Sequence, residues 1–272
     1  MEAGNSMFWP AFGLTVFAGL STGIGSFIAL FAGTGNRKFL SGALGFSAGV
    51  MIYISLGEIF FNARGILTES LGKNTGSWVS AGAFFAGIGF VALIDALVPA
   101  AENPHEMHQF QQDPPPGNKR NLQPLHRTGL FLAGIIALHN FPEGLATFLT
   151  ALHDPKLGVA IAVAVAIHNI PEGISVSVPI YYATGKRKTA FFYSFLSGLA
   201  EPAGALAGYF ILRPFINDTV FGVMFAAVAG IMVFIAIDEL IPAAENYGRH
   251  HWMIYGFIAG MMVMALSLLL FI

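Results

Sequence analysis

Long apolar runs, separated by short polar stretches, dominate the pattern of this chain. Each run has about 20 residues or more, which is the length that an α-helix needs to cross the hydrocarbon core of a bilayer. Hydrocarbon offers no hydrogen-bond partner to a free backbone group, so such runs are expected to be helical. We therefore expect an all-α integral membrane protein with eight transmembrane helices, near residues 7–32, 39–62, 78–99, 128–152, 157–183, 188–212, 216–242 and 252–272.

The composition agrees with a chain whose solvent is a lipid bilayer. Of its 272 residues, 55% are hydrophobic and only 10% are charged, whereas a soluble domain has about 25% charged residues. The net charge of -2 provides no basic surface for a nucleic acid, so no nucleic-acid partner is expected. The chain has no cysteine, which leaves nitrogen, oxygen and thioether sulfur as the atoms that can bind a metal.

The basic residues gather in alternate connections between the predicted helices. Four of these connections contain 9 of the 13 lysines and arginines, namely Arg37, Lys38, Lys119, Arg120, Arg127, Lys186, Arg187, Lys188 and Arg249. By the positive-inside rule these connections are cytoplasmic, so both termini are expected outside the cytoplasm, in a multi-pass protein of the cell membrane.

One connection is long, polar and rich in proline. Residues 100–127, between helices 3 and 4, are expected to be a flexible cytoplasmic loop. Its histidines His105 and His108 fit a solvated linker or a site that passes metal to the cytosol. Apart from this loop, residues 1–272 are expected to form a single transmembrane domain.

The first three and the last three predicted helices resemble each other. The segment 48–58 aligns without gaps onto 229–239, and Trp78 matches Trp252. Five predicted spans separate the equivalent helices, so the two copies cross the membrane in opposite directions. We expect a 3+2+3 arrangement with an inverted repeat of helices 1–3 and 6–8. Such repeats are typical of transporters, whose substrate site lies near the midplane.

A six-residue motif occurs in both central helices. His139-Asn140-Phe141-Pro142-Glu143-Gly144 is followed 29 residues later by His168-Asn169-Ile170-Pro171-Glu172-Gly173. In each copy the imidazole and the carboxylate lie four residues apart, on one face of a helix. Each proline removes one backbone hydrogen bond, and each glycine allows a neighbouring helix to approach closely.

Ionisable groups at this depth are costly and usually functional. A single copy of the motif is most simply interpreted as a kinked helix with a hydrogen-bonded histidine. Two matched copies favour a divalent-metal site, and Glu201 in helix 6 is expected at the same depth. An unpaired acid there costs about 2.5–3.5 kcal/mol on insertion scales, and a bound cation offsets the repulsion among such acids. Imidazole with carboxylate suits zinc and similar divalent ions.

These residues resemble the ZIP (Zrt/Irt-like) family of divalent-metal transporters, most closely its bacterial ZupT-like branch. The resemblance covers essentially the whole chain. It implies uptake of Zn²⁺, and also of Fe²⁺, Mn²⁺, Co²⁺ or Cd²⁺, into the cytoplasm as transported substrates, with no cofactor. It further implies two neighbouring metal positions, one formed by His139, Glu143, His168 and Glu172, and one formed by Asn140, Asn169 and Glu201 with the shared Glu143 and Glu172.

One residue departs from the family pattern, and another extends the comparison with the family to helix 2. Pro202 directly follows Glu201, so a local change in helix 6 is expected beside that acid. Some family members carry a methionine in helix 2, and Met51 is its expected equivalent. Four further acids are expected near helix ends, where they either line the path of the ion or meet basic loops: Glu58, Asp95, Asp238 and Glu239.

The main alternative to a carrier is an intramembrane metalloenzyme. A zinc protease typically has H-E-x-x-H on a helix, and this sequence lacks that motif, so no enzymatic activity is expected. The expected partners are divalent metal ions and the lipid bilayer. Glycine pairs four residues apart, such as Gly19/Gly23 and Gly45/Gly49, mark helix contacts, and whether any of them forms a homodimer interface is left open.

Overall fold

The computed structural model describes residues 2–31, 37–97, 137, 140–212, 214–215 and 217–270. All the regular elements in these ranges are helices, as the apolar runs predicted. Six helical segments of the described chain are long and apolar enough to cross a membrane: Met7–Ile28, Arg37–Leu71, Lys73–Ala96, Pro155–Val178, Asp218–Asn246 and His250–Leu270. The fold is that of an all-helical, multi-pass membrane protein.

The helices follow one another with short connections. The N-terminal part consists of α1 (Glu2–Phe31), α2 (Arg37–Ile54), the π-helical turn η1 (Ser55–Ile59), α3 (Phe60–Leu71) and α4 (Lys73–Leu97). Residues 140–153 are helical and are followed by α6 (Pro155–Thr184), α7 (Arg187–Gly198) and α8 (Ala200–Leu212). The C-terminal part consists of α9 (Asp218–Ile235), the π-helical turn η3 (Ala236–Leu240), α10 (Ile241–Asn246) and α11 (His250–Leu270).

Three boundaries differ from the expected ones. The helix that begins with α2 continues to Leu71 and the helix that begins with α9 continues to Asn246, beyond the apolar runs that end near 62 and 242. A helix does not have to stop at the edge of its apolar run, since polar residues support further turns in water. Glu58 and Glu239 therefore lie inside continuous helices. Predicted helix 6 is instead interrupted at Leu199, between α7 and α8. The predicted loop 100–127 lies outside the described residues.

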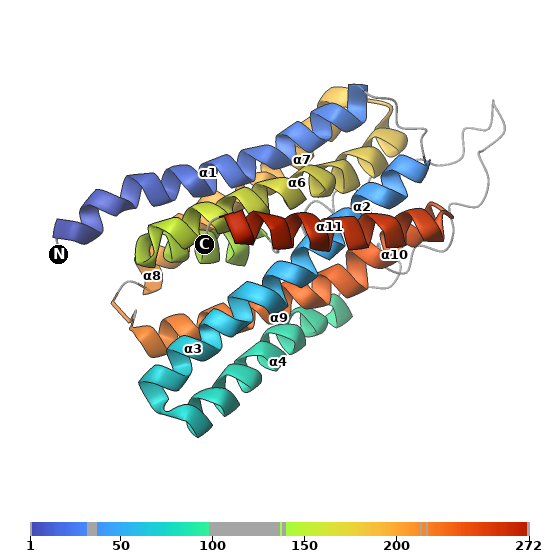
Figure 1. Ribbon diagram of the computed structural model, residues 1–272. Coiled ribbons are helices and arrows are strands. Elements are labelled where there is room, and N and C mark those ends of the chain that lie inside the picture. Colours follow the sequence, from blue (N-terminus) through green and yellow to red (C-terminus); the bar gives the residue numbers. More distant parts are fainter. Residues whose placement is uncertain are drawn as a thin grey trace.

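The helices form two groups (Figure 1). The first group contains α1, α6, α7 and α8, together with residues 140–153, whose Gly144 lies against the backbone of Glu201. The second group contains α2, α3, α4, α9, α10 and α11. The main contact between the groups is that of α2 with α6, where Leu40 packs with Ile174 and Val178.

Glycines allow close backbone contact inside each group. A Cβ on Gly25 of α1 would overlap the carbonyl of Ile170 in α6, and a Cβ on Gly49 of α2 would overlap the carbonyl of Phe257 in α11. The glycine pairs expected from the sequence all lie close to a neighbouring helix, where Gly23 and Gly208 face side chains and the other members face backbone carbonyls. None of the close approaches at described glycines joins one group to the other. The groups are thus tightly packed internally and meet through side chains.

The two π-helical turns occupy matching positions. Ser55, which begins η1, is seven residues after Ala48, and Ala236, which begins η3, is seven residues after Ala229. These are the starting residues of the segments that align in sequence. Each widened turn contains acidic residues, Glu58 in η1 and the pair Asp238 and Glu239 in η3. Turns of this kind occur frequently at functional sites.

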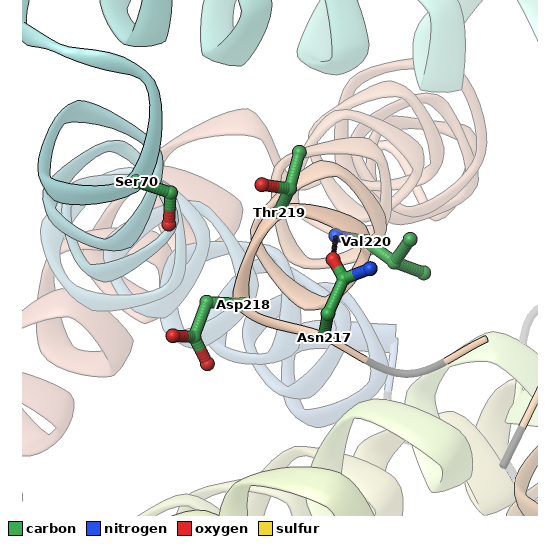
Figure 2. Close-up of a pocket in the computed structure, with 5 residues that line it drawn as sticks. All are labelled: Ser70, Asn217, Asp218, Thr219 and Val220. Carbon is green, nitrogen blue, oxygen red and sulfur yellow. Dashed lines mark hydrogen bonds between the residues drawn. The ribbon is translucent and has the colours of Figure 1, made fainter. Parts of the chain in front are cut away.

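The start of α9 shows how a backbone N–H group at a helix end finds a hydrogen-bond partner in this fold. Asn217 Oδ1 accepts a hydrogen bond of 2.9 Å from the backbone N–H of Val220 (Figure 2). Asp218 adds a negative charge near the positive end of the helix dipole. With Ser70 and Thr219 these residues line an open surface pocket (Figure 2). None of the predicted metal ligands lines this pocket.

Candidate metal site

The second motif lies in the middle of α6. His168 and Asn169 are fully buried and Glu172 is 2% exposed. The α-helix continues through Pro171 to Thr184. The carbonyl of His168 has a partner outside its own helix, because Ser47 Oγ of α2 donates a hydrogen bond to it at 3.2 Å. The second motif therefore presents its polar side chains to the protein interior, as the sequence predicted.

The first motif begins the helical residues 140–153. Asn140 is fully buried and Glu143 is 2% exposed. Gly144 lies so close to Glu201 that a Cβ would overlap the backbone of that residue, which is the close approach expected of this glycine. His139 lies outside the described residues.

The two motifs meet at His168 and Glu143. His168 Nε2 lies 2.9 Å from Glu143 Oε1, and both side chains are buried. Glu172 lies near enough to Glu143 for their charges to interact, and the Asn140 side chain forms a hydrogen bond with Glu172. The imidazole of His168 in α6 and the carboxylate of the first motif are thus in direct contact in the core, and the charge of Glu172 acts on the same carboxylate.

Glu201 joins the site from the break between α7 and α8. Its carboxyl oxygen Oε1 accepts a hydrogen bond from Asn169 Nδ2, and its charge interacts with those of Glu143 and Glu172. Glu201 stands in the first turn of α8, followed by Pro202. A proline in the first turn of a helix costs little, because the missing N–H has no helical acceptor there. The expected local change in helix 6 is therefore a break that precedes the acid.

Both motif asparagines are held by backbone carbonyls of neighbouring helices. Asn140 Nδ2 donates to the Ser197 carbonyl at 3.2 Å, and Asn169 Nδ2 donates to the Ala18 carbonyl at 3.0 Å. These bonds orient both amides, and each leaves its Oδ1 buried without a hydrogen-bond partner. A buried oxygen without a donor is costly and is rare in proteins. An amide oxygen of this kind is a chemically suitable ligand for a divalent cation.

The electrostatics of the site favour a cation. Glu143, Glu172 and Glu201 are all buried and act on one another. Buried like charges repel strongly, and the repulsion is relieved when a positive ion lies between them. Nitrogen from imidazole and oxygen from carboxylates and amides make a donor set for divalent ions of the zinc type. Among the described residues alone, no three His, Asp or Glu side chains lie close enough together to hold a metal ion.

Some buried hydroxyl residues beside the motifs were not expected from the sequence. Ser47 supports His168, and it is followed on one helix face by Met51, the expected helix-2 methionine, and by Ser55, all three fully buried. The spacing of these residues by four is the signal that was available. Thr147, one turn after Glu143, is also buried, and its Oγ1 has no hydrogen-bond partner.

Three of the four acids expected near helix ends interact electrostatically with the site or with one another. The charge of Glu239, in η3, acts on Glu172, and Asp238 and Asp95 in turn act on Glu239. Glu239 is only 9% exposed. Acidic residues thus continue from the motifs in the core toward the end of α4. Glu58 forms a separate contact, with Asn62 Nδ2 donating to its Oε1 at 2.7 Å.

Comparisons with known proteins identify the family of this chain. The family model described as "ZIP Zinc transporter" matches residues 98–268. The zinc transporter ZupT of Streptococcus mutans is 58% identical over 264 residues, which cover 97% of this chain and 98% of the relative. The protein of the same name from Clostridium perfringens is 55% identical over 285 residues and covers 100% of both chains. The chain therefore belongs to the ZIP family of zinc transporters, with bacterial ZupT proteins among its relatives.

Proposed function

We propose that this protein carries Zn²⁺ across the cell membrane into the cytoplasm through a site built from its two repeated motifs. The observation that carries the proposal is the buried contact of His168 Nε2 with Glu143 Oε1 at 2.9 Å, which joins the two motifs in the core. The relatives at 55–58% identity are named zinc transporters. An intramembrane metalloenzyme is not favoured, since these relatives are transport proteins.

The proposed site holds two ions. One position uses Glu143, His168 and Glu172 with His139, and the other uses Asn140, Asn169 and Glu201 with the shared Glu143 and Glu172. Contacts that support this division are the Asn140–Glu172 and Asn169–Glu201 hydrogen bonds, which keep each amide beside a carboxylate. The donor set contains no thiolate and only moderately soft nitrogen, so Fe²⁺, Mn²⁺, Co²⁺ and Cd²⁺ are proposed as further substrates.

We propose eight membrane crossings arranged as 3+2+3, with helices 1–3 and 6–8 as inverted copies. The matching positions of η1 and η3 support the repeat, because a sequence duplicate is expected to keep an irregular turn. The two chain ends lie toward the same end of the bundle (Figure 1), which agrees with an even number of crossings. The connections from α6 to α7 and from α10 to α11 lie at the opposite end (Figure 1), which we assign to the cytoplasm because these connections contain Lys186 and Arg249.

Transport proceeds by motion of the first helix group against the second. The first group carries the motif residues and Glu201, and glycine contacts make it a compact body. Side chains of α2 and α6 form the surface at which the two groups slide. The ion binds from outside, moves with the first group, and leaves along Glu239, Asp238 and Asp95 toward the cytoplasm. Such alternating access needs no ATP.

Flux into sealed vesicles tests the proposal. The purified protein is reconstituted into liposomes that contain a zinc-sensitive dye, and Zn²⁺ is added outside. We expect saturable accumulation inside the vesicles, competition by Cd²⁺, and no accumulation in liposomes without protein. Zinc-dependent turnover of a lipid or peptide without accumulation would favour the enzyme instead. Absence of flux in vesicles that contain folded protein would overturn the proposal.

A further inference from the structure

A cluster of two serines and one backbone carbonyl joins three helices beside the site. Ser26 Oγ of α1 lies 3.2 Å from the Gly173 carbonyl oxygen of α6, and Ser194 Oγ of α7 donates to the same carbonyl at 3.1 Å. The two hydroxyls are also hydrogen-bonded to each other. Ser26 and Ser194 are fully buried. We call these two side chains with the Gly173 carbonyl the serine clamp.

The clamp differs from the other buried hydroxyls of the same helices. Ser21 donates to the carbonyl of Ala18, Ser177 to that of Ile174 and Ser197 to that of Ser194, each within its own helix. Hydroxyls that bond back to their own helix are ordinary in apolar segments. The clamp hydroxyls also link α1, α6 and α7, although Ser26 Oγ additionally lies 3.3 Å from the Thr22 carbonyl of its own helix. Each hydroxyl has one proton, so one serine donates to the other and the second donates to Gly173.

The carbonyl that the clamp holds belongs to the second motif, next to Glu172. On the same stretch, a Cβ on Gly173 would overlap the Thr22 carbonyl, and a Cβ on Gly25 would overlap the Ile170 carbonyl. Residues 170–173 therefore rest directly on the backbone of α1. Four residues earlier, Asn169 is tied to the Ala18 carbonyl. Helix α1 thus anchors the motif on both sides of Glu172.

We propose that Ser26 and Ser194 are positioning residues that fix the Glu172 carboxylate relative to Glu143 and His168, and thereby set the affinity and ion selectivity of the site. This inference rests on the proposed function. Affinity for a metal depends strongly on how rigidly the ligands are held, and partners outside the ligand set change it about 10–100-fold. When the clamp is lost, Gly173 and the turn that carries Glu172 shift on α1. The spacing of the ligands then suits a larger ion better than Zn²⁺.

The test compares clamp variants with matched controls in the vesicle assay. Ser26→Ala and Ser194→Ala remove the clamp hydroxyls, and Thr15→Val and Ser177→Ala remove buried hydroxyls of the same helices that bond only within their own helix. We expect each clamp variant to raise the KM for Zn²⁺ about tenfold, with maximal rate unchanged and Cd²⁺ competing better. The controls keep the KM of the unmodified protein. The two hydroxyls form one chain of hydrogen bonds, and loss of either hydroxyl breaks it. The double variant Ser26→Ala/Ser194→Ala is therefore expected to have the same KM as either single variant. Ser194→Thr, which keeps the hydroxyl, restores the KM.

Zinc binding to the purified protein in detergent, measured by calorimetry, gives a readout that is independent of transport. A weaker binding constant in the clamp variants, with unchanged controls, supports the inference. Unchanged KM and binding, or a loss of maximal rate that merely follows the amount of folded protein, overturns it. Glu143→Ala is run in parallel, because normal uptake by that variant defeats the proposed function itself. If Glu143→Ala is inactive and the clamp variants have the KM of the unmodified protein, only the inference about the clamp is overturned.

Discussion

Ser47 Oγ in α2 donates a hydrogen bond to the backbone carbonyl of His168 in α6 at 3.2 Å. The bond runs from the second helix group to a residue of the proposed metal site in the first group. If the first group moves during transport, this bond has to break. Ser47 is therefore placed to stabilise the arrangement of the two groups that the structure presents.

Replacing Ser47 by alanine tests this role. A net contribution of ~1 kcal/mol from the hydrogen bond predicts a maximal uptake rate up to about fivefold higher for Ser47→Ala, because the resting arrangement is less stable. The measurement is initial-rate uptake into vesicles at saturating Zn²⁺. Ser41→Ala is the matched control, since Ser41 Oγ also donates to a distant carbonyl, that of Arg249 just before α11 at 3.2 Å, but within the second group. Equal rates for the two variants would contradict a role in group motion.

Close glycine contacts predict where stability is most sensitive. Gly49→Ala places a Cβ against the Phe257 carbonyl of α11, and such overpacking costs about 1–3 kcal/mol. We expect a lower melting temperature for the detergent-solubilised protein. Gly82→Ala in α4 is the control, because nothing lies within 4 Å of a Cβ at that position. An equal fall in both melting temperatures would show that helix-interior substitution, and not backbone contact, is responsible.

The position of Glu239 predicts an effect on release of the ion that is separate from binding of the ion. Its charge acts on Glu172, so Glu239→Gln is expected to lower the maximal uptake rate about tenfold by weakening the attraction along the exit path. Zinc binding measured by calorimetry stays close to that of the unmodified protein. Glu245→Gln is the control, because Glu245 lies further along the same helix and is half exposed, 3.1 Å from His250 Nδ1. A loss of zinc binding in Glu239→Gln would instead make Glu239 part of the binding site.

The sequence was sufficient for those features that depend on local pattern. Apolar runs predicted the helices, the repeated motif predicted that His168 and Glu143 would meet, and glycine spacing predicted the close helix contacts. These features follow from helix periodicity and from the cost of burying charge.

Features that depend on packing between distant segments were not predictable in the same way. The hydrogen bonds of Ser47 with His168 and of Ser26 with Gly173 join residues more than 100 positions apart. A serine inside an apolar helix gives no sign of whether it bonds to its own helix or to another. Glu239 was expected near a helix end because the apolar run ends there, but the helix continues to Asn246 and buries it.

The most direct measurement is zinc uptake by vesicles that contain the Glu143→Gln or Glu143→Ala variant, at matched amounts of folded, reconstituted protein. Glu143 is buried 2.9 Å from His168 Nε2, at the point where the two motifs meet. Gln keeps the shape of the side chain but removes the charge that a divalent ion requires. The account predicts uptake at the background level for both variants, beside saturable uptake by the unmodified protein. Uptake at the unmodified rate by either variant would contradict it.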